Sequence, residues 1–132
     1  MSAESTFTRS AIKYLRCPVE RVQIIENSGA FELSAIKDGV IILLALWSGP
    51  SVIAIAHYTS TLADPELELD PEIPVYIGDI DTLTNDQAPI LSPRGTCGVG
   101  EAAFFKNGVS EANMVGMNQQ VKFVETWRSL FG

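Results

Sequence analysis

The hydrophobic positions of the chain predict an alternation of strands and helices. An unbroken apolar run over 40–46 is typical of a central strand that is buried on both faces. Elsewhere, apolar residues recur at helical spacing or in shorter runs that resemble strands. The sequence predicts strands over 21–26, 40–46, 75–80, 102–105 and 112–115, and helices over 8–15, 28–36, 52–63, 83–91 and 118–131.

Two local signals refine this order near the C-terminus. Asn107 and Gly108 form a residue pair that tolerates the positive φ angles of a tight turn, so the last two strands should form a hairpin. We expect Asn118 to cap the last helix. Its inward face is predicted to carry Val121, Val124, Trp127 or Arg128, and Phe131. The whole order predicts an α/β fold with a mixed sheet of four to five strands, parallel at first, and helices on both faces.

Length and composition point to a single main domain. The 132 residues are 46% hydrophobic and 19% charged, which supplies one packed core without the polar excess of a disordered chain. Pro18 is expected to end the first helix, because a residue before proline is pushed out of helical geometry. We therefore expect an N-terminal helical extension over 1–20 and the main domain over 21–132.

The charge of the chain narrows the set of partners. A formal net charge of −7 disfavours contact with a phosphate backbone, so we expect no nucleic-acid partner.

The first residues lack the apolar core of a signal peptide, and the longest apolar run is far shorter than the roughly 20 residues of a membrane span. A cytoplasmic protein without membrane contact is expected. We interpret the acidic, proline-rich stretch at 64–74 as an exposed connection, with a binding site as the alternative.

Cysteine and histidine are too few for a metal site or a disulfide framework. The sequence contains Cys17, Cys97 and His57 and no others of these types. Their spacing matches no metal-binding pattern, so we predict no metal and no cofactor. We interpret both thiols as reduced, with a Cys17–Cys97 disulfide as the alternative.

Three motifs, met in order, resemble the thioredoxin family over about residues 22–131. W-S-G-P-S at 47–51 is similar to the family's W-C-G-P-C active site, and V-Y-I-G-D-I-D at 75–81 is similar to its third strand. E-A-A-F-F-K-N-G at 101–108 is similar to its hairpin, and Gly116 matches the glycine that lets the last sheet strand approach the active-site loop. The resemblance implies the thioredoxin-like three-layer sandwich.

The departures from the family pattern argue against redox chemistry. Ser48 and Ser51 replace the two cysteines, and a serine cannot form a mixed disulfide. Ile42 and Ile77 lie where the resemblance places a buried aspartate, which shuttles a proton, and the lysine beside it. Gly100 replaces the family's cis-proline, so we expect a trans peptide bond before it. Because a simple cysteine-to-serine substitution would leave these other positions intact, we favour a natural loss of redox function.

Two other kinds of site fit the sequence less well. A serine hydrolase would pair Ser48 or Ser51 with His57, but six positions along one helix turn Ser51 and His57 about 240° apart. His57 is therefore expected to be a half-exposed helix residue. Cys97, close to Arg94, is a candidate reactive thiol, with an inert thiol as the alternative.

We therefore expect a redox-inactive module that binds a protein partner, or acts as an assembly chaperone, through the former active-site surface. That surface is expected to consist of Trp47, Ser48, Gly49 and Pro50 on one side and Val99, Gly100 and Gly116 on the other. In the alternative, Trp47 only packs over the loop. Cysteine-poor members of the resembled family include assembly chaperones, for example those of hydrogenase maturation. The negative charge of the chain favours a basic partner, and a homodimer remains an alternative. The competing function is a thiol–disulfide oxidoreductase whose two active-site cysteines were replaced by serine.

Overall fold

The computed structural model describes residues 5–25, 35–45, 48–79, 101–114 and 119–132. Three helices, five strands and one short 3₁₀ helix lie in these ranges. They are α1 (Thr6–Tyr14), η1 (Val19–Arg21), β1 (Gln23–Ile25), β2 (Gly39–Leu44), α2 (Gly49–Ala63), β3 (Val75–Asp79), β4 (Glu101–Lys106), β5 (Val109–Met114) and α4 (Gln120–Phe131). None of these described helices combines the length and the apolar character needed to cross a membrane.

The strands form a five-stranded mixed sheet in the order β1-β3-β2-β4-β5. β1 and β2 both run parallel to β3, whereas β4 is antiparallel to β2 and β5 is antiparallel to β4. All six residues of β2 are buried, as expected for a strand in the middle of a sheet. The predicted mixed sheet, with its parallel first part and its antiparallel last two strands, is confirmed.

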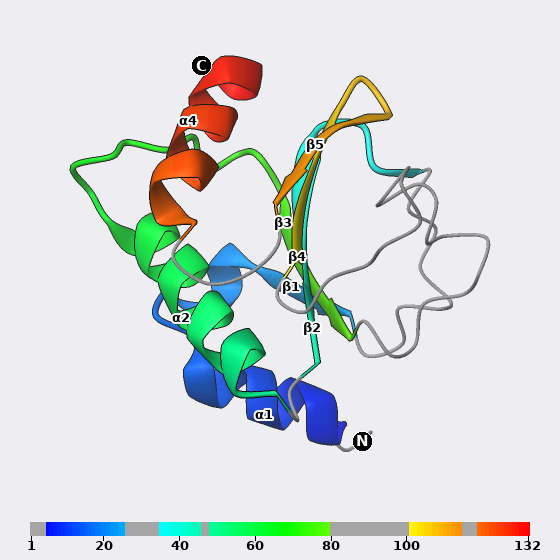
Figure 1. Cartoon of the computed structure of the whole chain (residues 1–132), viewed down its shortest axis with the longest axis vertical. Coiled ribbons are helices and arrows are strands. Elements are labelled where there is room, and N and C mark those ends of the chain that lie inside the picture. The colour runs from blue at the N-terminus through cyan, green and yellow to red at the C-terminus, as the bar shows by residue number, and fades with distance from the viewer. Residues whose placement is uncertain (1–4, 26–34, 46–47, 80–100, 115–118) are drawn as a thin grey trace.

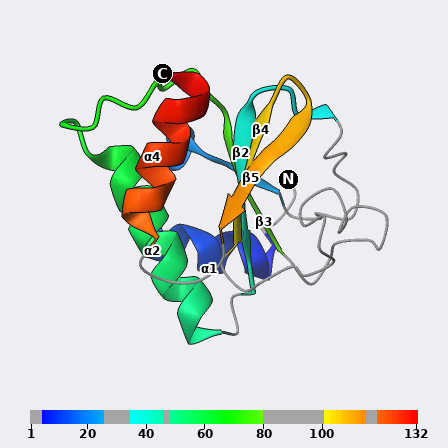
Figure 2. The ribbon, with the colours of Figure 1, turned by 45° about the horizontal axis from the view of Figure 1, so that its top comes forward.

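One face of the sheet is covered by α1, α2 and α4 (Figures 1 and 2). Ala11, Ile55 and Trp127, one from each helix, are fully buried in the core that these helices form with the sheet. A smaller cluster, which includes Ile41 and Phe105, lies on the other face. The helices predicted over 28–36 and 83–91 fall almost wholly outside the described residues.

The turn between β4 and β5 is the predicted two-residue hairpin turn. Asn107 has φ 53° and Gly108 has φ 81°, so both residues adopt the positive φ angles that this residue pair tolerates. The turn is tied to the chain just before β2, because Asn107 N donates to Asp38 Oδ1 at 2.9 Å and Gly108 N donates to Lys37 O at 2.9 Å. The hairpin therefore fixes the register of the antiparallel half of the sheet.

The prediction for the buried face of α4 was right for Trp127 and wrong for Val121. Val121 is 73% exposed, while Phe123 and Trp127 are completely buried. The Phe123 ring stacks on Tyr58 of α2 at 5.0 Å between centroids, and it lies 6.0 Å from the Trp127 ring. Large aromatic rings bury more apolar area than valines do, so they decide which face turns inward. The residue at the N-cap position of α4 is Gln119, rather than the predicted Asn118.

α1 packs against α2 and β1. Its N-cap is Ser5, whose hydroxyl accepts a hydrogen bond from Thr8 N at 3.0 Å. After the helix ends, Arg16 N donates to Thr59 Oγ1 of α2 at 2.9 Å, and Ala11 is fully buried in the core. This N-terminal segment therefore contributes to the same core as the sheet.

Candidate functional site

The serine turn lies where β2 ends and α2 begins, as predicted. Ser48 N donates to Ala45 O at 2.9 Å, and Ser48 O accepts from Val52 N at 3.3 Å, so Ser48 is the N-cap of α2. The Ser48 side chain is half-buried and makes no capping hydrogen bond. Gly49 and Pro50 are exposed, and a proline is well tolerated in the first turn of a helix. The turn thus presents an exposed backbone at one end of α2.

Ser51 has a structural role in this site. Its side chain is completely buried, and its Oγ accepts a hydrogen bond from Ala45 N at 3.0 Å. A main-chain N–H without a partner in this place would carry a desolvation cost of about 1–3 kcal/mol. The Ser51 hydroxyl therefore joins the end of β2 to the first turn of α2.

Ile42 and Ile77 are direct partners in the sheet. They face each other in the parallel register of β2 and β3, and both are completely buried. The two positions predicted to have lost a charged pair thus lie side by side in the apolar core. Neither side chain can accept or deliver a proton, so the described core beneath α2 offers no proton shuttle at these positions.

A buried carboxylate that sequence reasoning missed lies at Glu101, the first residue of β4. Its side chain is completely buried, and it pairs with Leu43 of β2 in the sheet register. Burial raises the pKa of Tyr58 to about 12, and the charge of Glu101 adds to this rise. The sequence offered one signal, since an acid begins the run of buried residues A-A-F-F.

His57 does not form a catalytic pair with serine. The residue is half-buried on α2, and its Nδ1 atom is buried without a hydrogen-bond partner among the described residues. Ser51 accepts its hydrogen bond from the main chain of Ala45 instead. The prediction of a half-exposed helix histidine agrees with this placement.

Cys17 carries a free, half-buried thiol. Burial raises its pKa, and the nearby charge of Arg21 opposes this rise to a smaller extent. A raised pKa lowers the thiolate fraction at neutral pH, so Cys17 is poorly suited to nucleophilic chemistry. Within the described ranges, no three His, Cys, Asp or Glu side chains gather as metal ligands.

The other predicted site residues fall outside the residues that the structure describes. Trp47 directly precedes the serine turn, and Val99 and Gly100 directly precede β4. Cys97, with its neighbour Arg94, and Gly116 lie in the same undescribed ranges. Their places in the proposed surface therefore stay predictions, and the described part of the site consists of Ser48, Gly49, Pro50 and Ser51.

Known structures share this architecture, although no protein-family model and no curated protein sequence matches the chain. The thioredoxin Mala s 13 of Malassezia sympodialis superposes with a TM-score of 0.62 and 21% identity, over 83% of this chain and 90% of that chain. Thioredoxin O2 of Arabidopsis thaliana gives a TM-score of 0.64 and 20% identity, over 88% and 99%. Mitochondrial thioredoxin 3 of Saccharomyces cerevisiae gives a TM-score of 0.60 and 15% identity, over 92% of this chain and 99% of that chain. At these identities the likeness establishes the fold, and the chain therefore has a thioredoxin-like fold.

Proposed function

We propose that the chain is a non-catalytic thioredoxin-fold protein that binds a protein partner through the surface at the N-terminus of α2. The observation that carries this proposal is the direct pairing of Ile42 with Ile77 in the buried sheet. An oxidoreductase disabled only by serine at 48 and 51 would keep its proton-transfer groups beneath those residues. The aliphatic pair supports a site that lost its chemistry at several positions.

The described surface offers shape and main-chain groups for recognition. Gly49 and Pro50 are exposed, and the Ser48 hydroxyl is not used to cap the helix. In the proposal, an extended segment of the partner lies across this turn and is held by apolar contacts and main-chain hydrogen bonds. Trp47 and Val99–Gly100 would complete the surface on its two sides. Release of the partner after assembly would make the protein an assembly chaperone.

The competing function is thiol–disulfide exchange by a protein whose native residues at 48 and 51 are cysteine. The gene sequence distinguishes the two, because the proposal requires serine codons at both positions. An assay of protein disulfide reduction, with dithiothreitol as electron donor, distinguishes the two functions in a second way. Turnover by the serine protein above the rate of dithiothreitol alone would refute the non-catalytic proposal.

The substitution Gly49→Asp tests the binding surface without threatening the fold. Apart from its chain neighbours and its own helix backbone, a Cβ atom at Gly49 would meet no atom of the described residues within 4 Å. An acidic residue in the first turn of a helix is favourable, and removing glycine from a helix lowers its entropic cost. The added charge and side chain should nevertheless block an extended partner. We expect affinity purification of the tagged protein from its source to yield one dominant partner, and Gly49→Asp to lose it.

Val109→Asp is the matched control, because it adds the same charge at a residue that is 57% exposed in the β4–β5 hairpin. This variant should retain the partner. Thermal unfolding should give Gly49→Asp a midpoint at or above that of the unmodified protein. A partner retained by Gly49→Asp would place the docking surface elsewhere.

A further inference from the structure

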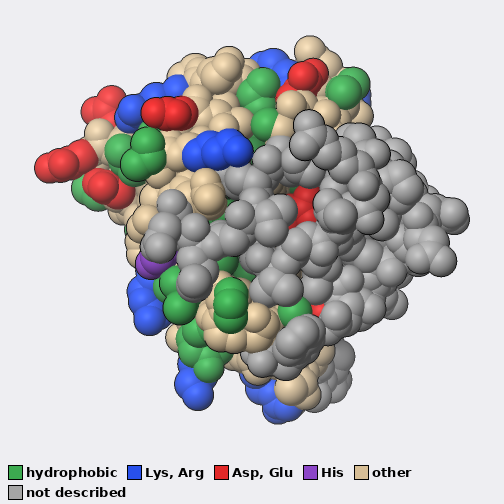
Figure 3. Space-filling view, in the orientation of Figure 1, with side chains coloured by type: hydrophobic (Ala, Val, Ile, Leu, Met, Phe, Trp, Pro, Cys, Tyr) green, Lys and Arg blue, Asp and Glu red, His purple; other side chains and the backbone are tan. Residues whose placement is uncertain are grey.

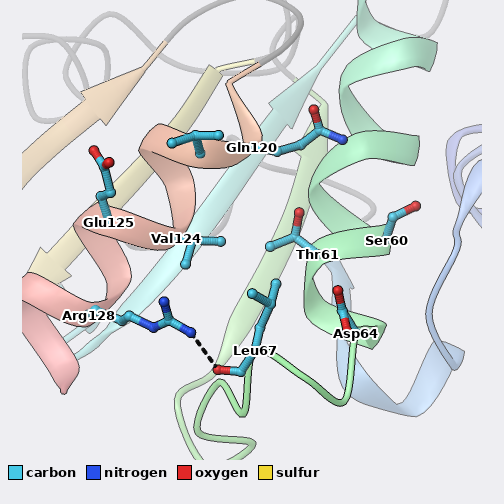
Figure 4. A pocket seen from close by; sticks show the side chains of 9 residues that line it. Ser60, Thr61, Asp64, Leu67, Gln120, Val124, Glu125 and Arg128 are labelled. Carbon is cyan, nitrogen blue, oxygen red and sulfur yellow. Dashed lines mark hydrogen bonds between the residues drawn. The ribbon is translucent and has the colours of Figure 1, made fainter.

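A groove with a volume of about 470 Å³ lies between the C-terminal part of α2 and α4 (Figure 4). Thr61 of α2 and Val124 of α4 line its two sides. Leu67, in the connection that follows α2, lies at one end, where Arg128 Nη2 donates to Leu67 O at 3.0 Å. Gln120 lies at the other end. The groove is thus built from two helices and a loop, each held by its own hydrogen bonds.

The packing of α4 leaves the apolar side chains of this groove partly uncovered. Phe123 and Trp127 occupy the buried face of the helix, so the flank with Val121 and Val124 faces the groove. Val121 is 73% exposed, and Val124 and Leu67 are half-buried. Removing this apolar surface from water would favour the binding of a partner side chain.

The connection beside the groove consists of two successive D-P-E turns. In the first turn, Asp64 Oδ1 accepts a hydrogen bond from Glu66 N at 2.9 Å. The second turn repeats the arrangement, since Asp70 Oδ1 accepts from Glu72 N at 2.9 Å. Aspartate stabilises a turn in this way by accepting a hydrogen bond from the backbone two residues further on.

One arginine fixes each of these turns through a main-chain carbonyl. Arg128 holds the first turn at Leu67 O, and Arg21 Nη1 donates to Ile73 O at 3.1 Å in the second. Both arginines therefore anchor the backbone of the connection. A loop held at two points loses less conformational entropy when a partner binds than a free loop does.

Carboxylates outnumber cations around the groove. Asp64 and Glu125 line the groove, and the connection that follows α2 carries four further exposed acids, Glu66, Glu68, Asp70 and Glu72. Figure 3 shows acidic side chains gathered at the edge of the molecule where this connection projects. The cations of α4 are Lys122 and Arg128, and Arg128 is already bound to a carbonyl of the connection. The excess of negative charge complements a basic partner and opposes a second copy of this chain, which carries the same charge of −7.

We propose that this groove is a second docking site, which binds a short basic segment of a protein by inserting one apolar side chain beside Val121, Val124 and Leu67. Lysines or arginines on either side of that anchor would lie against the acids of the connection. The site is separate from the surface at Ser48, because the 15 residues of α2 place the two ends of the helix roughly 20 Å apart. It therefore stands whether or not the surface at Ser48 binds a partner.

The probe is a short fluorescent peptide rich in lysine and arginine with one central leucine. We expect it to bind the full chain with a salt-dependent affinity, and the same peptide with serine in place of leucine to bind about tenfold more weakly. Val121→Ser should weaken the binding of the leucine peptide by a similar factor. Asp64→Asn keeps an oxygen to accept from Glu66 N, so it should preserve the turn while weakening binding about threefold.

Two controls separate the groove from the rest of the surface. Val109→Ser, a matched change at an exposed valine that does not line the groove, and Gly49→Asp should both leave the peptide affinity unchanged. Equal binding of the leucine and serine peptides would overturn the proposal, because it would reduce the interaction to non-specific charge attraction. It would also be overturned if Val121→Ser had no effect, or if sedimentation showed self-association that this variant abolishes.

Discussion

At the scale of single residues, the buried Ile42–Ile77 pair and the buried Glu101 show what sequence patterns reveal and what they conceal. Ile42 and Ile77 could be read from the sequence as aliphatic residues at the positions of the resembled family's charged pair, because both follow from a gapless match to its motifs. Glu101 was not readable as a core residue, since an acid at the start of a strand is ordinarily solvent-exposed. Its burial depends on segments that are distant in the chain, and a linear pattern does not contain that information.

The burial of Tyr58, together with the charge of Glu101, should make the stability of the protein depend on pH in the alkaline range. Its folded pKa is raised to about 12, whereas an unfolded tyrosine ionises near 10. Because the folded value is the higher one, the stabilisation by Tyr58 is complete below about pH 10 and is lost as the pH rises towards 12. We expect the free energy of unfolding, measured by urea titration, to fall in this range. The free energy of unfolding of Tyr58→Phe should fall less steeply with pH. Equal slopes for the variant and the unmodified protein would contradict the raised pKa of Tyr58.

At the scale of secondary structure elements, α4 shows why a helix can be predicted while its buried face is not. Its sequence contains two candidate apolar stripes, one with Val121 and Val124 and one with Phe123 and Trp127. Both stripes have helical spacing, so periodicity alone does not choose between them. The choice follows from the aromatic partners Tyr58 and Phe104, which come from other elements. Val121 and Val124, which the sequence placed on the inward face, line the proposed groove instead.

Substitutions in the two stripes of α4 should differ widely in their effect on stability. Phe123→Ala removes a completely buried ring and should lower the free energy of unfolding by about 3–5 kcal/mol. Val121→Ala alters a side chain that is 73% exposed, so it should change the free energy of unfolding by about 0.5 kcal/mol or less. Denaturant unfolding of both variants measures the difference. Similar losses from the two substitutions would contradict the observed phase of the helix.

At the scale of the whole molecule, the mixed sheet was predictable because its central strand and its hairpin each carry a strong local sequence signal. The aliphatic run at 40–46 identified the central strand, and the Asn107–Gly108 pair identified the hairpin. The groove between α2 and α4 was not predictable, because it depends on the phase of α4 and on two arginines that bind carbonyls 52 and 61 residues away in sequence. The sequence indicated an exposed acidic connection, with a binding site as the alternative, and gave no sign that these arginines hold it.

The central claim is the proposal that the site has lost its proton-transfer chemistry at positions beyond the two serines. The most direct test is the variant that carries both Ser48→Cys and Ser51→Cys, assayed for disulfide reduction with dithiothreitol beside an active thioredoxin. Far-ultraviolet circular dichroism should first show an unchanged fold. With Ile42 and Ile77 in place, we predict a turnover roughly 10²-fold or more below that of the thioredoxin, because a positioned proton-transfer group typically contributes this much. Turnover within a few-fold of the thioredoxin would contradict the account.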